Sequence, residues 1–304
     1  MTDDNPFARG CAWTQGEYVP IREAKMSLLD VGFSRSDVTY DVVAVWNGKF
    51  FRLEEHLDRF ERSMDRLHMN LEVDRDQIAE ILHECVRRSG LREAYVDMIA
   101  TRGWPARGGR DPWTFKNQFY AYAIPYLWIV EPHDQETGSH LVIARDTVRI
   151  PEASVDPTVK NFHWGDLTRG AFEAHERGGT VAALPDIDGN LTEGPGFNVF
   201  LVIDGEILTP DTGVLEGITR RTVLELAEEQ GLKTHVVPIP VGDVDKADEA
   251  FMTSTAGGVM PVTTIDGRQL LDGTPGPITT QLRQAYWDAH DDPRWTTPIT
   301  YEPT

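Results

Sequence analysis

The spacing of apolar residues in the first half of the chain predicts two amphipathic helices. The first is predicted where apolar residues recur at intervals of three and four, at Leu57, Phe60, Met64 and Leu67. The second carries Ile78, Ile81, Leu82 and Cys85. Asp74 stands where an N-cap belongs, and Gly90 stands where a helix of this length ends.

Extended segments surround these helices. Residues 40–46 are rich in β-branched and aromatic side chains, and Asn47–Gly48 then leads into Lys49–Phe51, which is typical of a two-residue β-hairpin. Residues 94–101 alternate so that one face of a predicted strand carries Tyr95, Asp97, Ile99 and Thr101. A Gly- and Arg-rich loop, 102–111, separates this strand from another at 118–124.

The second half of the chain continues as short strands mixed with a few helices. Helices are predicted over 166–177, 219–230 and 278–290, and strands over 141–144, 181–184, 199–203, 207–209, 235–237 and 250–253, with a hairpin around Asp266–Gly267. No regular alternation of strand and helix is present, so the pattern favours an α+β fold over a doubly wound sheet.

Shifts in composition predict the domain organisation. Residues 1–24 form a polar N-terminal arm, 25–130 a small domain, the turn-forming stretch 131–138 a linker, and 139–304 a large domain with a C-terminal helix and tail. The chain of 304 residues is long enough for two cores.

Charge and composition exclude several classes of partner. The formal net charge of −20 argues against binding to nucleic acid or to an anionic membrane, both of which need clustered Lys and Arg. The longest apolar run, 119–130, is too short to span a bilayer, and the polar start of the chain has no signal-peptide pattern. Cys11 and Cys85 show no metal-ligand spacing and suit two reduced thiols, so we expect a cytoplasmic protein without a metal.

Four segments have residue types that chemistry can use, although each also has a structural explanation. Lys160 lies in a mostly apolar and aromatic run before a helix, where a lysine either reaches the surface or serves Schiff-base chemistry. Glu193 precedes two glycines and is either a solvated turn residue or a cleft carboxylate. Gly217–Arg220 and Thr253–Gly258 are an N-cap and a tight turn, or two anion sites.

In this order, the segments resemble the fold-type IV enzymes that use pyridoxal 5'-phosphate, and within them most closely the (R)-selective amine transaminases. The resemblance covers about residues 25–290 and is carried by residues 36–41, 51–60, 95–103, 159–166, 191–198 and 253–261. It implies a two-domain α+β fold, with a small N-terminal α/β domain and a larger C-terminal domain that is β-barrel-like and has flanking helices.

The resemblance also implies the cofactor and the residues that hold it. Lys160 would form the Schiff base and move the proton between substrate and cofactor, and Glu193 would pair with the pyridine nitrogen. Arg59 would bind the phosphate as a bidentate donor, helped by residues at a helix start and in a turn: Ile218, Thr219, Ser254 and Thr255.

Substrate residues follow from the same resemblance: Arg35, Tyr40, Tyr95, Asp97, Arg107, Trp164 and Ala256. An acidic Asp97 would disfavour a substrate carboxylate nearby, which suits amines that lack one. Arg107 would bind the keto-acid carboxylate from a mobile loop, with Arg110 as its rival. Arg35 stands where relatives often have histidine, and an arginine there favours carboxylated substrates instead.

The resulting hypothesis is a ping-pong transfer of an amino group from an (R)-amine, arylalkyl or alkyl, to a keto acid such as pyruvate. The alternatives are a D-amino-acid or branched-chain aminotransferase of the same fold, an aminodeoxychorismate-lyase-like enzyme, and a non-catalytic cofactor-binding protein. By analogy with the family, the resemblance implies a homodimer with its active site at the subunit boundary.

Overall fold

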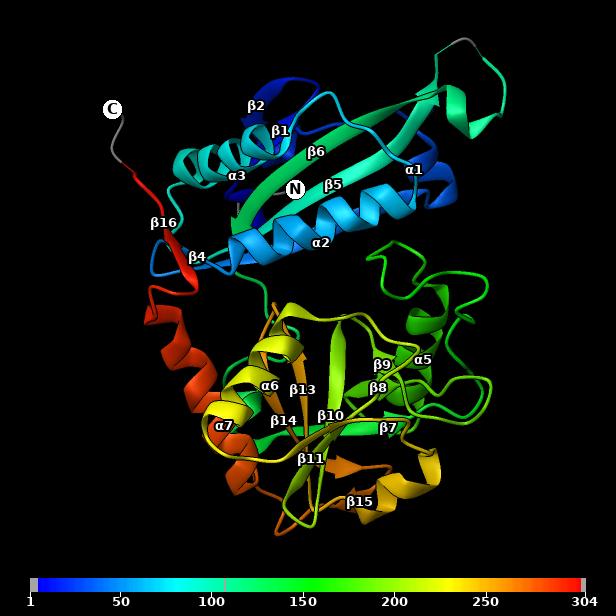
Figure 1. Ribbon diagram of the computed structural model, residues 1–304, viewed down its shortest axis with the longest axis vertical. Helices are drawn as coiled ribbons and strands as arrows, with labels where there is room; N and C mark the ends of the chain where they lie inside the picture. The colour runs from blue at the N-terminus through cyan, green and yellow to red at the C-terminus, as the bar shows by residue number, and fades with distance from the viewer. Residues whose placement is uncertain (1–4, 107, 302–304) are drawn as a thin grey trace. The chain divides into compact units, whose positions relative to one another are not determined.

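The structure is a computed structural model that describes residues 5–106 and 108–301, and it divides the chain into two compact units. The first unit contains the chain up to Leu127, the segment Val159–Phe162 and the chain from His290 onward. The second contains Trp128–Thr158 and His163–Ala289. Each unit has one sheet of its own (Figure 1). Two short segments of the predicted large domain, one of them carrying Lys160, therefore belong to the first unit.

The sheet of the first unit is built around three long antiparallel strands. These are β3 (Val38–Trp46), β5 (Ala94–Pro105) and β6 (Phe115–Pro125). The strand order is β16-β4-β3-β5-β6-β1-β2. The shorter strands are β1 (Cys11–Thr14), β2 (Glu17–Pro20), β4 (Lys49–Phe51) and β16 (Thr296–Pro298). The predicted Asn47–Gly48 hairpin is confirmed, since Trp46 pairs with Lys49 across that turn.

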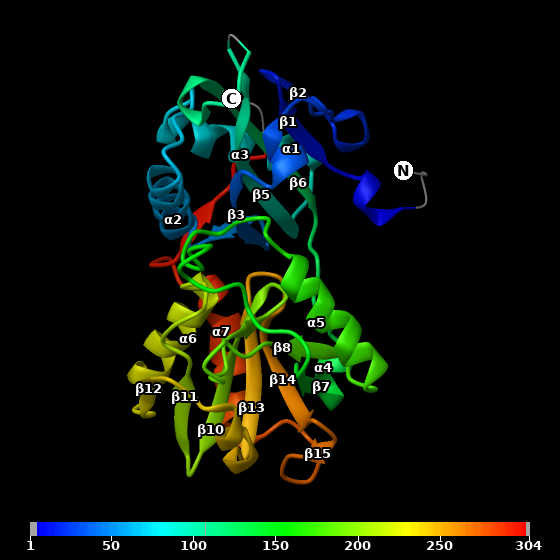
Figure 2. The same ribbon diagram turned by 90° about the vertical axis from the view of Figure 1, so that its right-hand side faces the viewer.

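Two helices cover one face of this sheet, α2 (Leu53–Arg66) and α3 (Arg75–Ser89) (Figures 1 and 2). Their apolar stripes enclose a core with the inward side chains of the strands, among them Leu57, Phe60, Leu82, Val96 and Met98. The predicted cap is confirmed: Asp74 accepts a hydrogen bond from the Gln77 backbone at 2.9 Å, and the two residues form a capping box. Gly90 ends the helix in the left-handed conformation.

Part of the expected N-terminal arm, residues 1–24, forms the strands β1 and β2. Cys11–Thr14 pairs with β6 and with β2, so that Cys11 faces Ala123 and Ala12 faces Tyr122. Cys11 and Ala12 are buried. The sequence did not indicate this pairing, because β6, the partner of β1, lies far along the chain.

The opposite face of the sheet is not covered by α2 and α3, and many of its side chains are aromatic or polar. The register places Tyr40, Val42 and Ala44 of β3 beside Ile99, Asp97 and Tyr95 of β5 on this face. Tyr120, Tyr122 and Ile124 of β6 complete it. We call this surface the aromatic face. The short helix α1 (Val31–Arg35) lies against it, and Gly32 is so close to Thr101 that a Cβ there would meet the threonine methyl at 2.7 Å.

The second unit contains the other sheet, in the order β12-β11-β10-β13-β14-β7-β8. Its strands are β7 (Ser139–Ile143), β8 (Val181–Ala183), β9 (Glu193–Gly194), β10 (Phe197–Ile203), β11 (Glu206–Thr209), β12 (Thr234–Val236), β13 (Glu249–Ser254), β14 (Gly258–Ile265) and β15 (Arg268–Gln269). β9 pairs with β10, and Leu184, just after β8, exchanges backbone hydrogen bonds with 192–193. The sheet therefore curls back on itself, as the barrel-like expectation requires.

Three helices pack on this sheet. α6 (Ile218–Glu229) and α7 (Pro277–Asp288) lie against β13 and each other, and α5 (Gly165–Glu176) lies against β8 (Figure 1). All three predicted helices are confirmed with boundary shifts of one or two residues. The remaining helical segments are short: α4 (Asp134–Thr137) and the 3-10 turns Pro6–Ala8, Ile21–Glu23, Pro112–Thr114, Val241–Lys246 and Ala289–Asp291. Among the described residues, no helix is long and apolar enough to cross a membrane.

Candidate active site

Lys160 is fixed to the first unit through its own backbone. Its carbonyl oxygen accepts hydrogen bonds from the Thr39 hydroxyl at 2.8 Å and the Tyr40 amide at 3.1 Å. Its neighbour Asn161 forms an isolated antiparallel bridge with Thr39. The segment therefore extends the edge of β3, which fixes the position from which the lysine side chain starts.

The lysine side chain reaches the aromatic face. Its Nζ lies 4.5 Å from the centre of the Tyr40 ring, which is within the range of a cation–π contact. Phe162 packs against the same tyrosine, with 4.7 Å between the two ring centroids. Lys160 is half-buried rather than extended into solvent, so the surface alternative considered from the sequence is not what the structure shows.

Asp97 is a buried acid on the same face. Its side chain is 3% exposed, and its Oδ2 accepts a hydrogen bond from the Tyr122 hydroxyl at 2.9 Å. Burial raises the pKa of Asp97 to about 8, against the lowering effects of the Tyr122 hydrogen bond and the Lys160 charge. The interpretation that an ionised Asp97 repels carboxylates therefore needs correction, because near pH 7 this group is largely protonated and uncharged.

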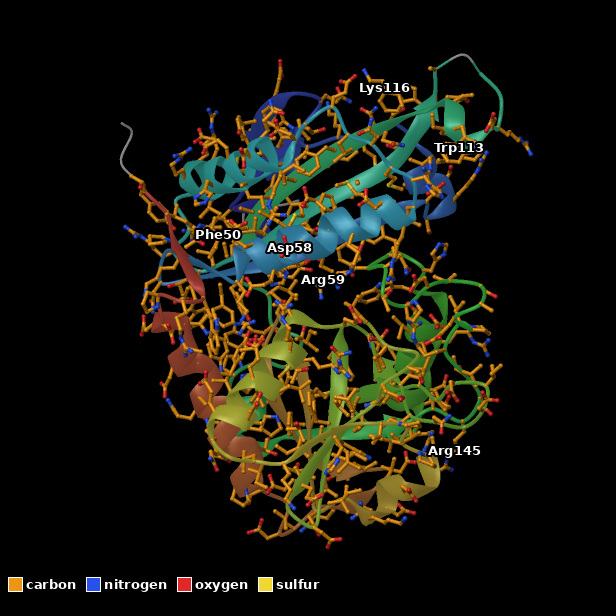
Figure 3. The ribbon with its side chains drawn as sticks, in the orientation of Figure 1. Phe50, Asp58, Arg59, Trp113, Lys116 and Arg145 are labelled. Atoms are coloured by element: carbon orange, nitrogen blue, oxygen red, sulfur yellow. The ribbon has the colours of Figure 1, made fainter. Side chains whose placement is uncertain are left out.

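Arg59 and its partners form a second polar cluster of the first unit, between α2 and β3 (Figure 3). Its Nε and Nη2 donate to the two carboxylate oxygens of Asp41 at 2.7 and 2.8 Å. Asp41 also contacts His56 Nδ1 at 2.7 Å, and all three side chains are at most 3% exposed. Burial favours a higher pKa for Asp41, but the Arg59 charge outweighs it and holds that pKa below its usual range. A buried, oriented guanidinium suits the binding of a phosphate.

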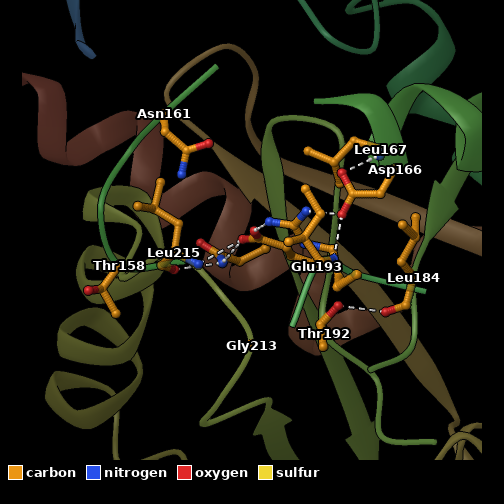
Figure 4. A network of polar contacts seen from close by, with 12 residues as sticks. Thr158, Asn161, Asp166, Leu167, Leu184, Thr192, Glu193, Gly213 and Leu215 are labelled. Atoms are coloured by element: carbon orange, nitrogen blue, oxygen red, sulfur yellow. Dashed lines mark hydrogen bonds and ion pairs between the residues drawn. The ribbon is translucent and has the colours of Figure 1, made fainter. Parts of the chain in front are cut away.

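Glu193 lies in the second unit, where it is the centre of a polar network (Figure 4). Its Oε1 accepts from Arg149 at 3.0 Å, and its Oε2 accepts from the Leu215 backbone at 2.8 Å. Asn198 lies 3.4 Å from the same Oε2. Arg149 also forms an ion pair with Asp166. These donors fix the Glu193 carboxylate in one orientation, as pairing with a pyridine nitrogen requires.

Two further backbone features of the second unit suit an anion. α6 begins after Gly217 without a side-chain cap, and Ile218 and Thr219 occupy its buried first turn. The Thr219 hydroxyl lies 3.5 Å from that of Tyr286. In the turn after β13, the Ser254 hydroxyl accepts from the Ala256 amide at 3.1 Å, and Thr255 is half-buried. Both features lie at the positions that the sequence assigned to phosphate binding.

The chemistry of these groups fits a phosphorylated pyridine aldehyde. Such a cofactor needs an amine for its aldehyde, an anion for its ring nitrogen and donors for its phosphate. Groups of these types are present in each unit: the Lys160 amine and the buried Arg59 guanidinium in the first, and the hydrogen-bonded Glu193 carboxylate and the uncapped start of α6 in the second. The orientation of Glu193 by three separate donors is the feature that a solvated turn residue would not show.

The remaining predicted substrate residues are distributed over both units. Tyr95 is half-buried on the aromatic face, and burial raises its pKa well above the usual value. Trp164, in the second unit, is 36% exposed and lies 3.5 Å from the place of a Cβ on Gly196. Arg35 ends α1 and is exposed, as is Arg110. Arg107 lies outside the described residues.

Sequence reasoning missed the residues that orient the predicted ones. Asp41 and His56 hold Arg59, and Arg149 and Asn198 hold Glu193. One signal was available, because His56 and Arg59 are three apart on a predicted helix and therefore share a face. Arg149 gave no such signal, since it lies in an irregular segment far from Glu193 in the sequence.

Comparison with known proteins places this arrangement in a family. The model of the amino-transferase class IV family matches residues 39–265. A putative branched-chain-amino-acid aminotransferase of Methanocaldococcus jannaschii is 30% identical over 278 residues, which are 91% of this chain and 95% of that protein. A D-alanine aminotransferase of Bacillus licheniformis is 28% identical over 272 residues, 89% of this chain and 93% of that protein.

Solved structures agree with this relationship. The branched-chain amino acid aminotransferase of Thermobaculum terrenum, in its pyridoxal-phosphate holo form, superimposes with a TM-score of 0.85 at 29% identity, covering 97% of this chain and 99% of that chain. The expected two-domain fold-type IV architecture is thereby confirmed. The chain belongs to the class IV aminotransferases and is an aminotransferase that depends on pyridoxal 5'-phosphate.

Proposed function

We propose that this aminotransferase moves an amino group from an (R)-amine, arylalkyl or alkyl, to a keto acid such as pyruvate, with its cofactor bound to Lys160. The observation that carries the proposal is the position of the Lys160 amine, 4.5 Å from the Tyr40 ring, on a face rich in aromatic side chains. Tyr95, Tyr122 and the largely uncharged Asp97 share that face. Such surroundings suit the apolar or aromatic substituent of an amine.

Each polar group then has a distinct task. The bound cofactor supplies an electron-withdrawing ring for the electrons of the breaking Cα–H bond. Lys160 Nζ removes the proton from substrate Cα, and Glu193, oriented by Arg149 and the Leu215 amide, would pair with the ring nitrogen. Arg59, Ile218, Thr219, Ser254 and Thr255 hold the phosphate. We also propose that Tyr40, Tyr95, Asp97, Trp164, Ala256 and the loop arginines contact the substrates.

A second function has its own support. Relatives of this chain are named branched-chain-amino-acid and D-alanine aminotransferases, and these names favour an amino acid as donor. Arg35 supports the same alternative, because an exposed arginine at the end of α1 offers a cation for a substrate carboxylate. The two functions differ in which donor reacts.

A donor panel separates them. The cofactor-loaded enzyme is mixed with (R)- or (S)-1-phenylethylamine, D- or L-alanine or leucine, and the loss of the visible cofactor absorbance is followed without an acceptor. The proposal expects (R)-1-phenylethylamine to react fastest by at least about tenfold in kcat/KM. Faster reaction of D-alanine or leucine establishes the second function instead. Absence of reaction with every donor refutes both.

We further propose a cytoplasmic homodimer. The supporting observation is a set of exposed apolar side chains around α1: Leu28 is 76% exposed, Leu29 77% and Phe33 61%. Neighbouring apolar side chains of this size are typical of a protein interface. Sedimentation tests the proposal: the wild-type protein should sediment as a dimer, and the double variant Leu28→Glu with Leu29→Glu should dissociate at micromolar concentration.

A further inference from the structure

Among the described residues of the first unit, three carboxylic acids are buried at its sheet, and two of them are fully paired. Asp30 accepts from the Gly32 amide at 2.8 Å with one oxygen and from the Thr101 hydroxyl at 2.7 Å with the other. Asp41 uses both of its oxygens on Arg59. Both carboxylate oxygens of Asp30 and of Asp41 therefore have hydrogen-bond partners, as is usual for buried acids with a structural role.

Asp97 is the exception. Its Oδ2 accepts from Tyr122, but its Oδ1 is buried and has no hydrogen-bond partner among the described residues. The Met98 amide lowers the pKa of the acid but makes no hydrogen bond of normal geometry to that oxygen. An unpaired buried oxygen is costly enough that its persistence calls for an explanation. Because Asp97 shares the aromatic face with the Lys160 amine, whose charge acts on it, the explanation belongs with the reacting substrate.

The hydrogen bond to Tyr122 leaves Oδ1 as the oxygen of Asp97 that has no partner among the described residues. When the Tyr122 hydroxyl donates to Oδ2, the proton of the neutral acid is carried by Oδ1. The group that remains is an O–H donor for which the described residues supply no acceptor. The titratable groups that act on this site come from β3, β5, β6 and the lysine segment: Tyr40, Asp41, Tyr95, Tyr122 and Lys160.

A transaminase of the proposed kind must place two unlike groups in one pocket. The amine donor brings an apolar substituent, and the keto-acid acceptor brings a carboxylate. An ionised acid would repel the second and would be costly to bury beside the first. A neutral carboxyl group tolerates an apolar neighbour and donates a strong, charge-assisted hydrogen bond to a carboxylate.

We propose that protonated Asp97 binds the carboxylate of the keto-acid acceptor through its Oδ1–H, and that the same uncharged group admits the apolar substituent of the amine donor. Asp97 is thereby the residue that lets one pocket serve both half-reactions. The inference rests on the proposed function and deepens it, since it names the recognition of the acceptor. It assigns to Asp97 a task that the family resemblance assigned to a loop arginine.

The consequence for pH has a definite sign. The pKa of Asp97 is raised to about 8 by burial, so the donor is present below that pH and is lost above it. The acceptor half-reaction, pyruvate with the pyridoxamine-phosphate enzyme, should fall by about tenfold per pH unit above the midpoint. The amine half-reaction should not show this fall. Because the amine donor itself also loses a proton as the pH rises, the contribution of Asp97 is obtained by comparing wild type with Asp97→Asn at each pH.

The test measures both half-reactions in single turnovers, from about pH 6.5 to about pH 9.5, for wild type, Asp97→Asn and Asp97→Leu. The Asn amide keeps an N–H donor that does not titrate, so the pyruvate half-reaction of Asp97→Asn should not show the fall at high pH that wild type shows. The Leu variant has no donor, so the ratio of pyruvate to amine rates at neutral pH should fall by about 10- to 100-fold. In the cofactor-free protein, infrared difference spectra should show a protonated-carboxyl band that Asp97→Asn removes.

Three outcomes overturn the proposal. One is an unchanged ratio in Asp97→Leu. Another is a selective loss of the pyruvate half-reaction in Arg107→Ala or Arg110→Ala with no such loss in Asp97→Leu, which assigns the carboxylate to the loop instead. The third is the absence of the infrared band. Failure of the proposed function is distinguishable, because no amine would then react with the wild-type enzyme at any pH.

Discussion

Asp41 holds Arg59 through two hydrogen bonds, 2.7 Å from Nε to Oδ2 and 2.8 Å from Nη2 to Oδ1. The pair is buried. Asp41 lies on β3, and Arg59 lies on α2. Because Asp41 binds two nitrogens along one edge of the Arg59 guanidinium, this planar group has a fixed orientation. Asp41 is therefore a positioning residue for Arg59, the arginine that we propose binds the phosphate.

Asp41→Asn tests this relationship without removing the arginine. We expect about a tenfold weaker affinity for pyridoxal 5'-phosphate, because Arg59 keeps its charge but loses its bidentate anchor. Fluorescence titration of the cofactor-free protein measures this affinity, and competition by inorganic phosphate should weaken in parallel. The matched control is Asp58→Asn on the same helix, where the acid is 63% exposed and pairs with Arg75. Equal affinities of both variants and the wild type would show that Asp41 does not position Arg59.

The same acid gives the stability of the protein a pH dependence. Burial alone would raise the pKa of Asp41, but Arg59 lowers it below the usual carboxyl range. A lowered folded-state pKa means that the stabilisation is complete above about pH 4 and is lost as the pH falls through the folded-state value. Urea unfolding at about pH 7 and at about pH 3 should therefore separate wild type from Asp41→Asn more at the higher pH, because loss of the stabilisation begins near pH 4. An equal separation at both pH values contradicts the assignment.

Arg149 performs a related task in the second unit, where it lies between two carboxylates, Glu193 and Asp166. Arg149→Met leaves both acids without their shared cation. We expect a loss of about 3 kcal/mol in the free energy of unfolding of the cofactor-free protein. Arg145→Met is the control, since that arginine is 69% exposed and its pair with Asp266 spans 3.3 Å, so the loss should stay below about 1 kcal/mol. Similar losses in the two variants would refute a special role for Arg149.

Substitution of Gly103 tests whether the bend in the hairpin of β5 and β6 requires a glycine at this position. The register of these strands shifts between Thr101 and Trp104, and Gly103 has φ of +76° with the Lys116 carbonyl against the place of its missing Cβ. Gly205 has φ of +77° but open space around it. Gly205→Ala should therefore cost about 1 kcal/mol from backbone strain, and Gly103→Ala should cost at least about 2 kcal/mol more because of the clash. Denaturant unfolding compares them, and equal costs would contradict the clash.

Local pattern was sufficient to predict much of the fold. The Asn47–Gly48 turn, the Asp74 cap and the alternation of residues 95–101 all appear as predicted, because each depends on neighbours in the sequence. Two segments that the sequence assigned to the large domain lie in the first unit. Val159–Phe162 and the chain from His290 onward join the first unit, and their pairing partners Thr39 and Phe51 are far away in sequence. Spacing alone has no information on such pairings.

For the candidate site, too, the sequence indicated some features and not others. The family resemblance selected Lys160, Arg59 and Glu193, and the structure gives each of them ordered surroundings. It selected Asp97 as well but not its protonation, which depends on burial and on Tyr122 from the neighbouring strand. Charge states of this kind follow from tertiary packing, so the sequence alone implied an anion where the fold favours a neutral acid.

The central claim is that Lys160 bears the cofactor, and chemical trapping tests it most directly. The enzyme is loaded with pyridoxal 5'-phosphate, reduced with borohydride, digested and mapped by mass spectrometry. We predict the phosphopyridoxyl group on the peptide that contains Lys160, and loss of this modification in Lys160→Ala. Quantitative modification of another lysine, such as Lys49 or Lys116, with Lys160 unmodified would contradict the account.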